Sequence, residues 1–325
     1  MRVGVIGRGF GARVVAPVFE QTEGCEVVDV VSPRDEAAVA ALCARRDVDL
    51  ISVHSPPFLH LDHVRRAIES AHAVLCDKPF GRNADEAAEM CHLAAEAGVV
   101  NLVNFEFRWS PVRQQIRGLI LDGTLGTIDH VQWSGFDSGW RLPLRAFDWI
   151  FDADLGGGWV RSYGSHIIDF GRWALGEIVE TTGRIRTTIT KRPDAEGRLR
   201  EVTAEDGFTA TLLAQSGATM VIDTCYVSPA DLPGRIMVIG SEMVLESISS
   251  SIHELDAQIT LYAKDVEPKR IAVEQRGDPH RVQMEDWAVV VRDAVRSGGV
   301  EPGTPTFADA LACARVMDAL ARSPR

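Results

Sequence analysis

The first twelve residues of the chain restrict its fold more than any other segment. The apolar residues of Arg2–Ile6 are typical of a buried strand, and residues 13–20 have the pattern of a helix. Between them stands the sequence Gly7-x-Gly9-x-x-Ala12. A G-x-G-x-x-G/A turn between a strand and a helix is typical of a unit that binds a dinucleotide. The sequence therefore predicts a dinucleotide-binding domain.

The residues of this turn have separate predicted tasks. Gly7 permits the tight turn, and Gly9 lets the backbone approach a pyrophosphate. The helix that follows directs N–H groups and the positive end of its dipole at the phosphates. We therefore expect Gly7, Gly9, Phe10 and Gly11 to bind the cofactor. The alternative is a turn with a structural role only.

The residues after the second predicted strand, Glu26–Val31, bear on which nicotinamide dinucleotide is bound. NAD sites usually have an acidic residue here, which bonds the ribose 2′-hydroxyl. This chain has Ser32 and Arg34 instead, and a hydroxyl with a guanidinium suits a 2′-phosphate. The sequence favours NADP, with NAD as the alternative, and predicts that both residues contact the cofactor. Arg34 could instead only open the next helix.

A rigid loop follows the third predicted strand, residues 48–53. Pro56 and Pro57 forbid a helix, so the loop can form a wall of a nucleotide pocket. We expect Ser55, Pro56 and His60 to line the cofactor site. His60 and His63 could be read as a metal pair, but no further ligands cluster with them, so no metal is predicted.

A reactive candidate follows the fourth predicted strand, Ala73–Cys76. Parallel sheets bind ligands beyond the carboxyl ends of their strands, and Asp77-Lys78-Pro79 stands at that point. Burial and a neighbouring positive charge can lower a lysine pKa toward neutrality, which makes the amine usable as a proton donor or acceptor. We expect Lys78 to be catalytic and both Asp77 and Lys78 to contact the cofactor. A solvated lysine in a turn is the alternative.

Strands alternate with helices as far as residue 106, which predicts a doubly wound parallel sheet. Asn104 ends the last of these strands, 99–103, and should border the same crevice. Further along, strands follow one another without helices, at 128–136, 181–190, 207–214, 218–226, 235–239, 245–248 and 258–262. They predict a C-terminal α+β domain with a large, mostly antiparallel open sheet. Two helices, 281–296 and 307–322, complete the pattern.

These patterns predict two domains, an NAD(P)-binding domain at 1–106 and a substrate and oligomerisation domain at 107–325. An open sheet with one face uncovered should bury that face against another subunit. We therefore expect a homodimer or a homotetramer that assembles through the C-terminal sheet.

A histidine in the second domain is the other catalytic candidate. His166 follows the glycines 156–158 and should lie in the first turn of a helix that begins near Ser165 and ends at Gly176. The positive end of the helix dipole disfavours imidazolium, and a neutral imidazole can exchange a hydrogen bond with a substrate hydroxyl. The alternative is a buried histidine at a domain interface.

Composition excludes several classes of function. The net charge of -12 disfavours a phosphate-backbone ligand, so no nucleic-acid partner is expected. No apolar run is long enough to cross a bilayer, and Met1 leads directly into a strand rather than a signal peptide. The six cysteines are scattered without a C-x-x-C pair, which favours reduced thiols in a cytoplasm.

Taken together, these motifs resemble the glucose–fructose oxidoreductase, inositol dehydrogenase and MocA (Gfo/Idh/MocA) family over nearly the whole chain. The resemblance rests on Gly7-x-Gly9, Pro56-x3-His60, Asp77-Lys78-Pro79 and the triple glycine before His166. It implies a Rossmann domain, an α/β domain whose sheet mediates oligomers, and reversible oxidation of a secondary alcohol on a sugar or polyol. It also implies that Lys78 carries the proton while the nicotinamide takes the hydride.

One departure from the family leaves alternatives open. Many members have an aspartate four residues before the histidine, and this chain has Ser162. Either His166 and Lys78 suffice, Tyr163 or a nearby acid substitutes, or the chemistry is altered. An NADP-preferring sugar or polyol dehydrogenase is the first hypothesis. A redox-assisted glycosidase or lyase with a recycled cofactor, and a non-catalytic sugar or nucleotide sensor, are the others.

Overall fold

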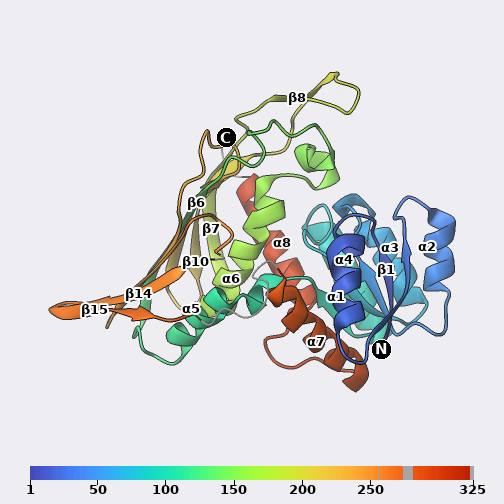
Figure 1. Ribbon diagram of the computed structural model, residues 1–325, viewed down its shortest axis with the longest axis horizontal. Helices are drawn as coiled ribbons and strands as arrows, with labels where there is room; N and C mark the ends of the chain where they lie inside the picture. The colour runs from blue at the N-terminus through green and yellow to red at the C-terminus, as the bar shows by residue number, and fades with distance from the viewer. Residues whose placement is uncertain (255, 274–280, 323–325) are drawn as a thin grey trace. The chain divides into compact units, whose positions relative to one another are not determined.

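The computed structural model describes residues 1–254, 256–273 and 281–322, and these fall into two compact units. Unit 1 combines Met1–Trp109 with Arg281–Arg315, and unit 2 combines Ser110–His280 with Val316–Arg325. Each unit has its own sheet and its own covering helices (Figure 1).

Unit 1 is built on a five-stranded parallel sheet in the order β2-β1-β3-β4-β5. Its strands are β1 (Arg2–Ile6), β2 (Glu26–Val31), β3 (Leu50–Val53), β4 (Ala73–Cys76) and β5 (Asn101–Val103). Its helices are α1 (Ala16–Gln21), α2 (Glu36–Cys43), α3 (His60–Glu69), α4 (Ala84–Ala97) and α7 (Val282–Ser297). The predicted doubly wound parallel sheet is confirmed.

Local sequence signals account for these elements. All four residues of β3 are buried, as expected where helices cover both faces of a parallel sheet. The Asn83 side chain accepts a hydrogen bond from the Glu86 N–H at 2.9 Å, which caps the start of α4. Gly98 ends α4 in a left-handed conformation, with φ of +62°.

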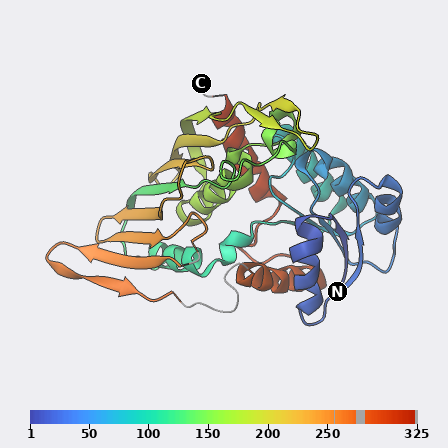
Figure 2. The ribbon, with the colours of Figure 1, turned by 45° about the horizontal axis from the view of Figure 1, so that its top comes forward.

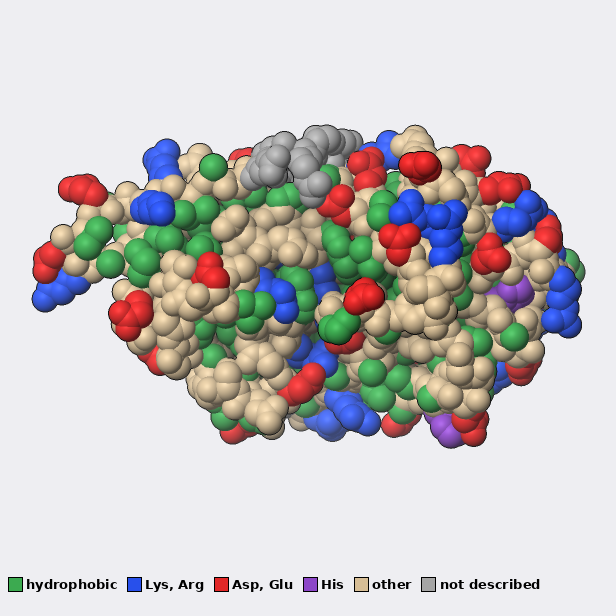
Figure 3. All heavy atoms as spheres, turned by 90° about the horizontal axis from the view of Figure 1, so that it is seen from below, with side chains coloured by type: hydrophobic (Ala, Val, Ile, Leu, Met, Phe, Trp, Pro, Cys, Tyr) green, Lys and Arg blue, Asp and Glu red, His purple; other side chains and the backbone are tan. Residues whose placement is uncertain are grey.

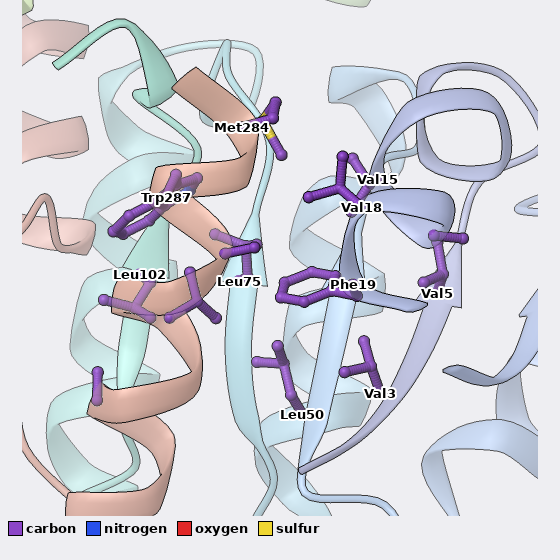
Figure 4. Packing of buried hydrophobic residues seen from close by; sticks show 14 residues of the cluster. Val3, Val5, Val15, Val18, Phe19, Leu50, Leu75, Leu102, Met284 and Trp287 are labelled. Carbon is purple, nitrogen blue, oxygen red and sulfur yellow. The ribbon is translucent and has the colours of Figure 1, made fainter. Parts of the chain in front are cut away.

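The C-terminal part of unit 1 differs from the expected division at residues 106/107. Helix α7 supplies Met284, Trp287 and Val291 to the core of the first unit, where they pack with residues such as Phe19 and Leu75. Figure 4 shows Trp287 on α7 beside Leu102 and Leu75. Because its apolar face has this partner, α7 belongs to the compact unit that holds the parallel sheet.

Unit 2 contains an eight-stranded sheet in the order β15-β14-β13-β12-β6-β11-β10-β7. Every neighbouring pair is antiparallel except β6 and β11, so the predicted mostly antiparallel open sheet is confirmed. The strands are β6 (Ile128–Phe136), β7 (Ile178–Arg186), β10 (Gly207–Ala214), β11 (Thr219–Cys225), β12 (Gly234–Gly240), β13 (Val244–Ser249), β14 (Gln258–Ala263) and β15 (Val266–Ile271). Figure 2 shows β14 and β15 at one end of this sheet.

Helices α5 (Pro111–Leu121) and α6 (Ser165–Leu175) belong to the same unit, and α8 (Phe307–Ala321) runs from one unit into the other. Residues on alternate positions of β10 and β11, such as Phe208, Leu212 and Ile222, are fully buried. Thr209, Val221 and Asp223, on the other face, are half-buried and Thr211 is exposed, which leaves the second face of the sheet partly open.

Several elements were not predicted or are shifted. Strand β7 lies three to four residues earlier than expected, and the short hairpin of β8 (Lys191–Pro193) and β9 (Leu199–Glu201) was missed, as was β15. Every residue of β9 is exposed, and five of the six residues of β15 are exposed. Strands without a buried face have no alternating pattern for sequence reasoning to find. Short 3-10 or π turns complete the described chain: η1 (Gly11–Val15), η2 (Pro57–Leu59), η3 (Glu106–Trp109), η4 (Trp149–Phe151), η5 (Ala153–Leu155) and η6 (Val160–Gly164).

Candidate active site

Two glycines of the turn in unit 1, Gly7 and Gly11, pack closely against His54, whereas Gly9 has free space around it. Gly7 has a φ of +152°, and a Cβ there would lie 2.6 Å from the carbonyl oxygen of His54. A Cβ on Gly11 would lie 3.0 Å from the Cβ of His54, whereas one on Gly9 would meet no atom within 4 Å. Gly7 and Gly11 therefore allow close packing, while the exposed Gly9 leaves room for a phosphate group.

Ser32 and Arg34 follow β2 on the same edge of the sheet. The Arg34 N–H donates to Ser32 Oγ at 3.4 Å, and the cap of α2 is Asp35, whose Oδ1 accepts from the Ala38 N–H at 3.0 Å. Arg34 therefore stands before the cap rather than opening the helix. Its side chain is exposed, and among the residues the structure describes its guanidinium makes no hydrogen bond or ion pair.

The loop after β3 is held by two buried histidines. His60 is the first residue of α3 and is fully buried, with Nε2 bonded to the Ser55 carbonyl at 2.7 Å. His63 Nδ1 lies 3.0 Å from Ser55 Oγ. The side chains of Ser55 and His60 are thus engaged within the loop, and half-buried Pro56 presents the more accessible surface. We infer that His60 contributes to cofactor binding indirectly, by holding this loop in its conformation.

Because these two histidines are buried, we predict that the free energy of unfolding falls in mild acid. Burial lowers the pKa of His63 to about 4, and burial also lowers that of His60. The unfolded chain takes up these protons near pH 6.5, so the stabilisation is complete above that pH and declines as the pH falls toward 4, by up to about 1.4 kcal/mol per pH unit for each histidine.

The measurement is the free energy of unfolding in urea between pH 7 and pH 4.5. We expect His63→Asn, which keeps an acceptor for Ser55, to flatten the decline. His92→Asn, on the exposed part of α4, should keep the wild-type slope. If the free energy of unfolding falls equally steeply with pH in the wild type, His63→Asn and His92→Asn, the acid sensitivity does not come from His63.

The carboxyl ends of β4 and β5 bring Asp77, Lys78 and Asn104 together. Asp77 Oδ1 accepts hydrogen bonds from the Lys78 N–H at 2.9 Å and from Asn104 Nδ2 at 3.2 Å. Burial acts to raise the pKa of Asp77, but the His54 hydrogen bond and the neighbouring positive charges outweigh it, so the pKa lies below its usual value. Asp77 is therefore an ionised acceptor just beyond the carboxyl end of β4.

Asn104 offers a test of whether this edge fits a cofactor. Its side chain is fully buried, and within the described part of the chain its Oδ1 has no hydrogen-bond partner. A buried acceptor without a partner costs free energy that a ligand donor can recover. The residues present therefore fit a dinucleotide that brings an N–H or O–H donor to Asn104.

His54 is a member of this cluster that the sequence reasoning missed. Its Nδ1 lies 3.1 Å from Asp77 Oδ2, and its Nε2 lies 2.7 Å from Ser52 Oγ. One sequence signal could have found it: a histidine directly follows the apolar strand β3, and ligands of parallel sheets bind beyond the carboxyl ends of the strands.

In unit 2, His166 lies in the first turn of α6, as predicted, and is only 2% exposed. Its carbonyl oxygen accepts a hydrogen bond from Arg113 Nη1 at 2.9 Å. Arg113 in turn forms two hydrogen bonds with the Glu254 carboxylate, at 2.8 and 3.1 Å, and its guanidinium lies 4.8 Å from the centre of the Trp133 ring. A buried ion pair thus fixes the backbone of the turn that carries His166.

The surroundings of Ser162 bear on which side chain could replace the aspartate that the family resemblance implies at this position. The Tyr163 hydroxyl donates to the Ile252 carbonyl at 2.5 Å, and burial together with the charge of Glu254 raises its pKa. A buried phenol that is already donating is a poor proton acceptor. Glu205 is a nearby acid whose carboxylate accepts the Val160 N–H at 2.9 Å and whose pKa is raised by burial.

Within the described residues, no cluster of three or more His, Cys, Asp or Glu side chains is arranged to hold a metal. No described helix has the length and apolar character needed to cross a membrane. Acidic and basic side chains both occur across the face of the molecule in Figure 3.

The parallel sheet with its glycine turn defines a dinucleotide-binding unit, and the second sheet forms a separate unit. Residues 1–105 match the model of an oxidoreductase family with an NAD-binding Rossmann fold, and residues 113–246 match the GFO/IDH/MocA C-terminal domain. The chain belongs to the Gfo/Idh/MocA oxidoreductase family, as the sequence motifs predicted.

Curated relatives agree with this assignment. The chain is 30% identical over 246 residues to D-xylose 1-dehydrogenase (NADP(+)) 2 of Haloferax volcanii, an alignment that spans 70% of each protein. It is 29% identical to an uncharacterized oxidoreductase of Synechocystis over 63% of this chain. The chain spans 60% of that relative's length.

Solved structures share the fold along the whole chain. Levoglucosan dehydrogenase in complex with NADH and L-sorbose superposes with a TM-score of 0.85 over 99% of this chain and 96% of that one, at 18% identity. At this identity the likeness establishes the fold alone.

Proposed function

We propose that the protein is an NADP-preferring dehydrogenase or reductase that acts on a secondary alcohol or ketone of a sugar, cyclitol or related diol. The observation that carries the proposal is the cluster at one edge of the parallel sheet. There the open Gly9 follows β1, the Asp77-Lys78 pair follows β4, and Asn104 follows β5, with a side-chain oxygen that has no partner among the described residues. The names of relatives, D-xylose 1-dehydrogenase (NADP(+)) and D-apiose dehydrogenase, support the substrate class.

Each residue of the cluster has a proposed task. Gly7, Gly9, Phe10 and Gly11 hold the pyrophosphate, and the loop at Pro56 lines the pocket. When bound, the nicotinamide ring supplies the acceptor for the hydride that leaves the carbinol carbon. Lys78 Nζ takes the proton of the substrate hydroxyl, and it returns that proton to the carbonyl oxygen in the reverse direction.

The remaining residues orient these groups. Asp77 holds the backbone N–H of Lys78 and bonds Asn104, so the lysine leaves the strand in a fixed direction. We propose that the imidazole of His166 exchanges a hydrogen bond with a substrate hydroxyl. Its position within α6 is maintained by Arg113.

A screen of sugars, cyclitols and their ketones with NADP(H) and NAD(H), followed by absorbance of the reduced cofactor, tests the proposal. We expect net, substrate-dependent oxidation or reduction of the cofactor with at least one compound. Turnover of a glycoside with no net change in cofactor would indicate the redox-assisted glycosidase or lyase instead. Sugar or dinucleotide binding without any turnover would favour a non-catalytic sensor. The sensor is the second candidate because the chain has Ser162 where an acid is expected.

The preference for NADP predicts the effect of Arg34→Ala. Its exposed guanidinium makes no ion pair with other described residues, so it is available to a 2′-phosphate. We expect a loss of affinity for NADPH of about tenfold or more, roughly the value of one charge-assisted hydrogen bond, and little change for NADH. Titration of cofactor fluorescence measures both constants.

Arg45→Ala is the matched control for this change. Arg45 lies beyond the other end of α2 and pairs with Asp47, so its removal should leave both affinities unchanged. An equal loss of NADPH and NADH affinity in Arg34→Ala would contradict the assignment to the 2′-phosphate.

We further propose a cytoplasmic homodimer or homotetramer that assembles through the open face of the eight-stranded sheet. That face presents half-buried and exposed residues from several strands, including Met237 and Ile248, which suit an interface. The described cysteines are all free thiols, as expected in a reducing compartment. Sedimentation as a monomer at assay concentrations would contradict the assembly.

A further inference from the structure

We propose that His54 is a positioning residue for Lys78, which it orients by holding the Asp77 carboxylate and by packing beneath the glycine turn. This inference rests on the proposed dehydrogenase function and adds a residue to it. His54 connects Ser52 of β3 to Asp77, which follows β4, and Asp77 in turn accepts a hydrogen bond from the backbone N–H of Lys78.

The hydrogen bonds of His54 fit one of the two tautomers of a neutral imidazole. Asp77 accepts two N–H bonds at Oδ1, so its Oδ2 is the atom left for His54. An ionised carboxylate can only accept, which places the proton of the imidazole on Nδ1. In a neutral imidazole Nε2 is then an acceptor, and the Ser52 hydroxyl, 2.7 Å away, is its donor. Ser52 thereby selects the tautomer in which His54 donates to Asp77.

Burial makes this arrangement rigid. The side chain of His54 has no exposed surface, and Ser52 is also fully buried within β3. Ser52, His54 and Asp77 follow the order of a nucleophilic triad, but a hydroxyl buried in a central strand is out of reach of a substrate. The chain of bonds therefore serves to orient Asp77 rather than to activate a serine.

His54 also contacts the turn that is proposed to hold the pyrophosphate. The backbone and Cβ of His54 leave no space for a Cβ on Gly7, and its Cβ would be 3.0 Å from one on Gly11. The ring of Phe10 lies 5.9 Å from the imidazole, centre to centre. One residue thus touches both the cofactor turn and the acid beside the lysine, so it can fix the position of Lys78 relative to the turn.

The test compares His54→Leu with His54→Asn. Leucine removes both hydrogen bonds, whereas the Nδ2 of asparagine can replace Nδ1 as a donor to Asp77. We expect His54→Leu to lower kcat about 10- to 100-fold, the size of effect that misplacement of a catalytic group produces, with a much smaller change in the dissociation constant of NADPH. His54→Asn should recover most of the loss.

His72→Leu is the matched control. His72 is also buried in unit 1, but it precedes β4 at the other end of the sheet, and its ring bonds the carbonyls of Val48 and Cys43. We expect it to lower stability without a selective loss of kcat. Equal losses of kcat in His72→Leu and His54→Leu would overturn the positioning role, as would a His54→Asn variant no better than leucine.

A measurement without turnover separates this inference from the proposed function. The hydrogen-bonded Nδ1–H of His54 should give a downfield proton resonance in the cofactor-free protein, and Asp77→Asn should shift or remove it. Absence of that resonance would overturn the bond to Asp77 whatever the enzyme's activity. The turnover rate of the wild-type enzyme tests the dehydrogenase function alone. The ratio of each His54 variant's kcat to the wild-type kcat tests the positioning role of His54.

Discussion

Lys78→Met should reduce turnover by at least ~10²-fold, the usual contribution of a positioned acid or base, while the protein still binds NADPH. Methionine keeps most of the apolar stem of lysine, up to Cε, but has no amine to exchange a proton. The change removes the amine that follows β4 and leaves the Asp77 bond to the backbone N–H available, because that bond does not involve the side chain. Steady-state rates and cofactor titration measure the two effects.

Lys191→Met provides the control for this loss. Lys191 is exposed in the β8–β9 hairpin and pairs with Glu201 at 2.9 Å, so the same chemical change there should leave turnover near the wild-type value. Near-normal turnover of Lys78→Met would remove the lysine from the mechanism. Loss of NADPH binding together with turnover would instead place its role in cofactor binding.

Arg113→Met should lower the free energy of unfolding by about 3–5 kcal/mol, because it leaves the buried carboxylate of Glu254 without its charged partner. Arg113 is 2% exposed, and its guanidinium bonds both oxygens of Glu254 and the His166 carbonyl. Urea denaturation followed by tryptophan fluorescence measures the loss, since five of the seven tryptophans, Trp133, Trp140, Trp149, Trp159 and Trp173, lie in unit 2.

Two further variants decide whether the buried ion pair is the cause. The double variant Arg113→Met with Glu254→Leu removes both charges and should recover most of the stability. Arg145→Met breaks the exposed pair with Asp148 and should cost less than about 1 kcal/mol. If Arg113→Met costs no more than Arg145→Met, the ion pair does not determine the stability of this unit.

Local signals explain why much of unit 1 could be predicted. The strand Arg2–Ile6 has the predicted bounds, Asn83 caps α4, and Gly98 ends it. Each of these features depends on a few adjacent residues, such as a side-chain oxygen at a helix start or a glycine with positive φ. His166 in the first turn of α6 was predictable for the same reason.

Features that depend on distant residues could not be predicted. Nothing near Trp287 in the sequence indicates that it packs with Leu75 and Leu102. The role of His54 depends on Asp77, which is 23 residues away, so its imidazole had no visible partner in the sequence. The inward orientation of His60 depends on the Ser55 carbonyl, and hydrogen bonds to backbone atoms leave no trace in residue identity.

The membership of α7 in unit 1 has a consequence for how the protein is made. The ribosome must add roughly 170 residues, those between Trp109 and Arg281, before Trp287 can join the core that contains Leu75. At synthesis rates of about 5–20 residues per second, the nascent domain waits on the order of ten seconds or longer with that apolar surface uncovered. Chaperones that recognise exposed apolar segments would have this interval in which to bind it.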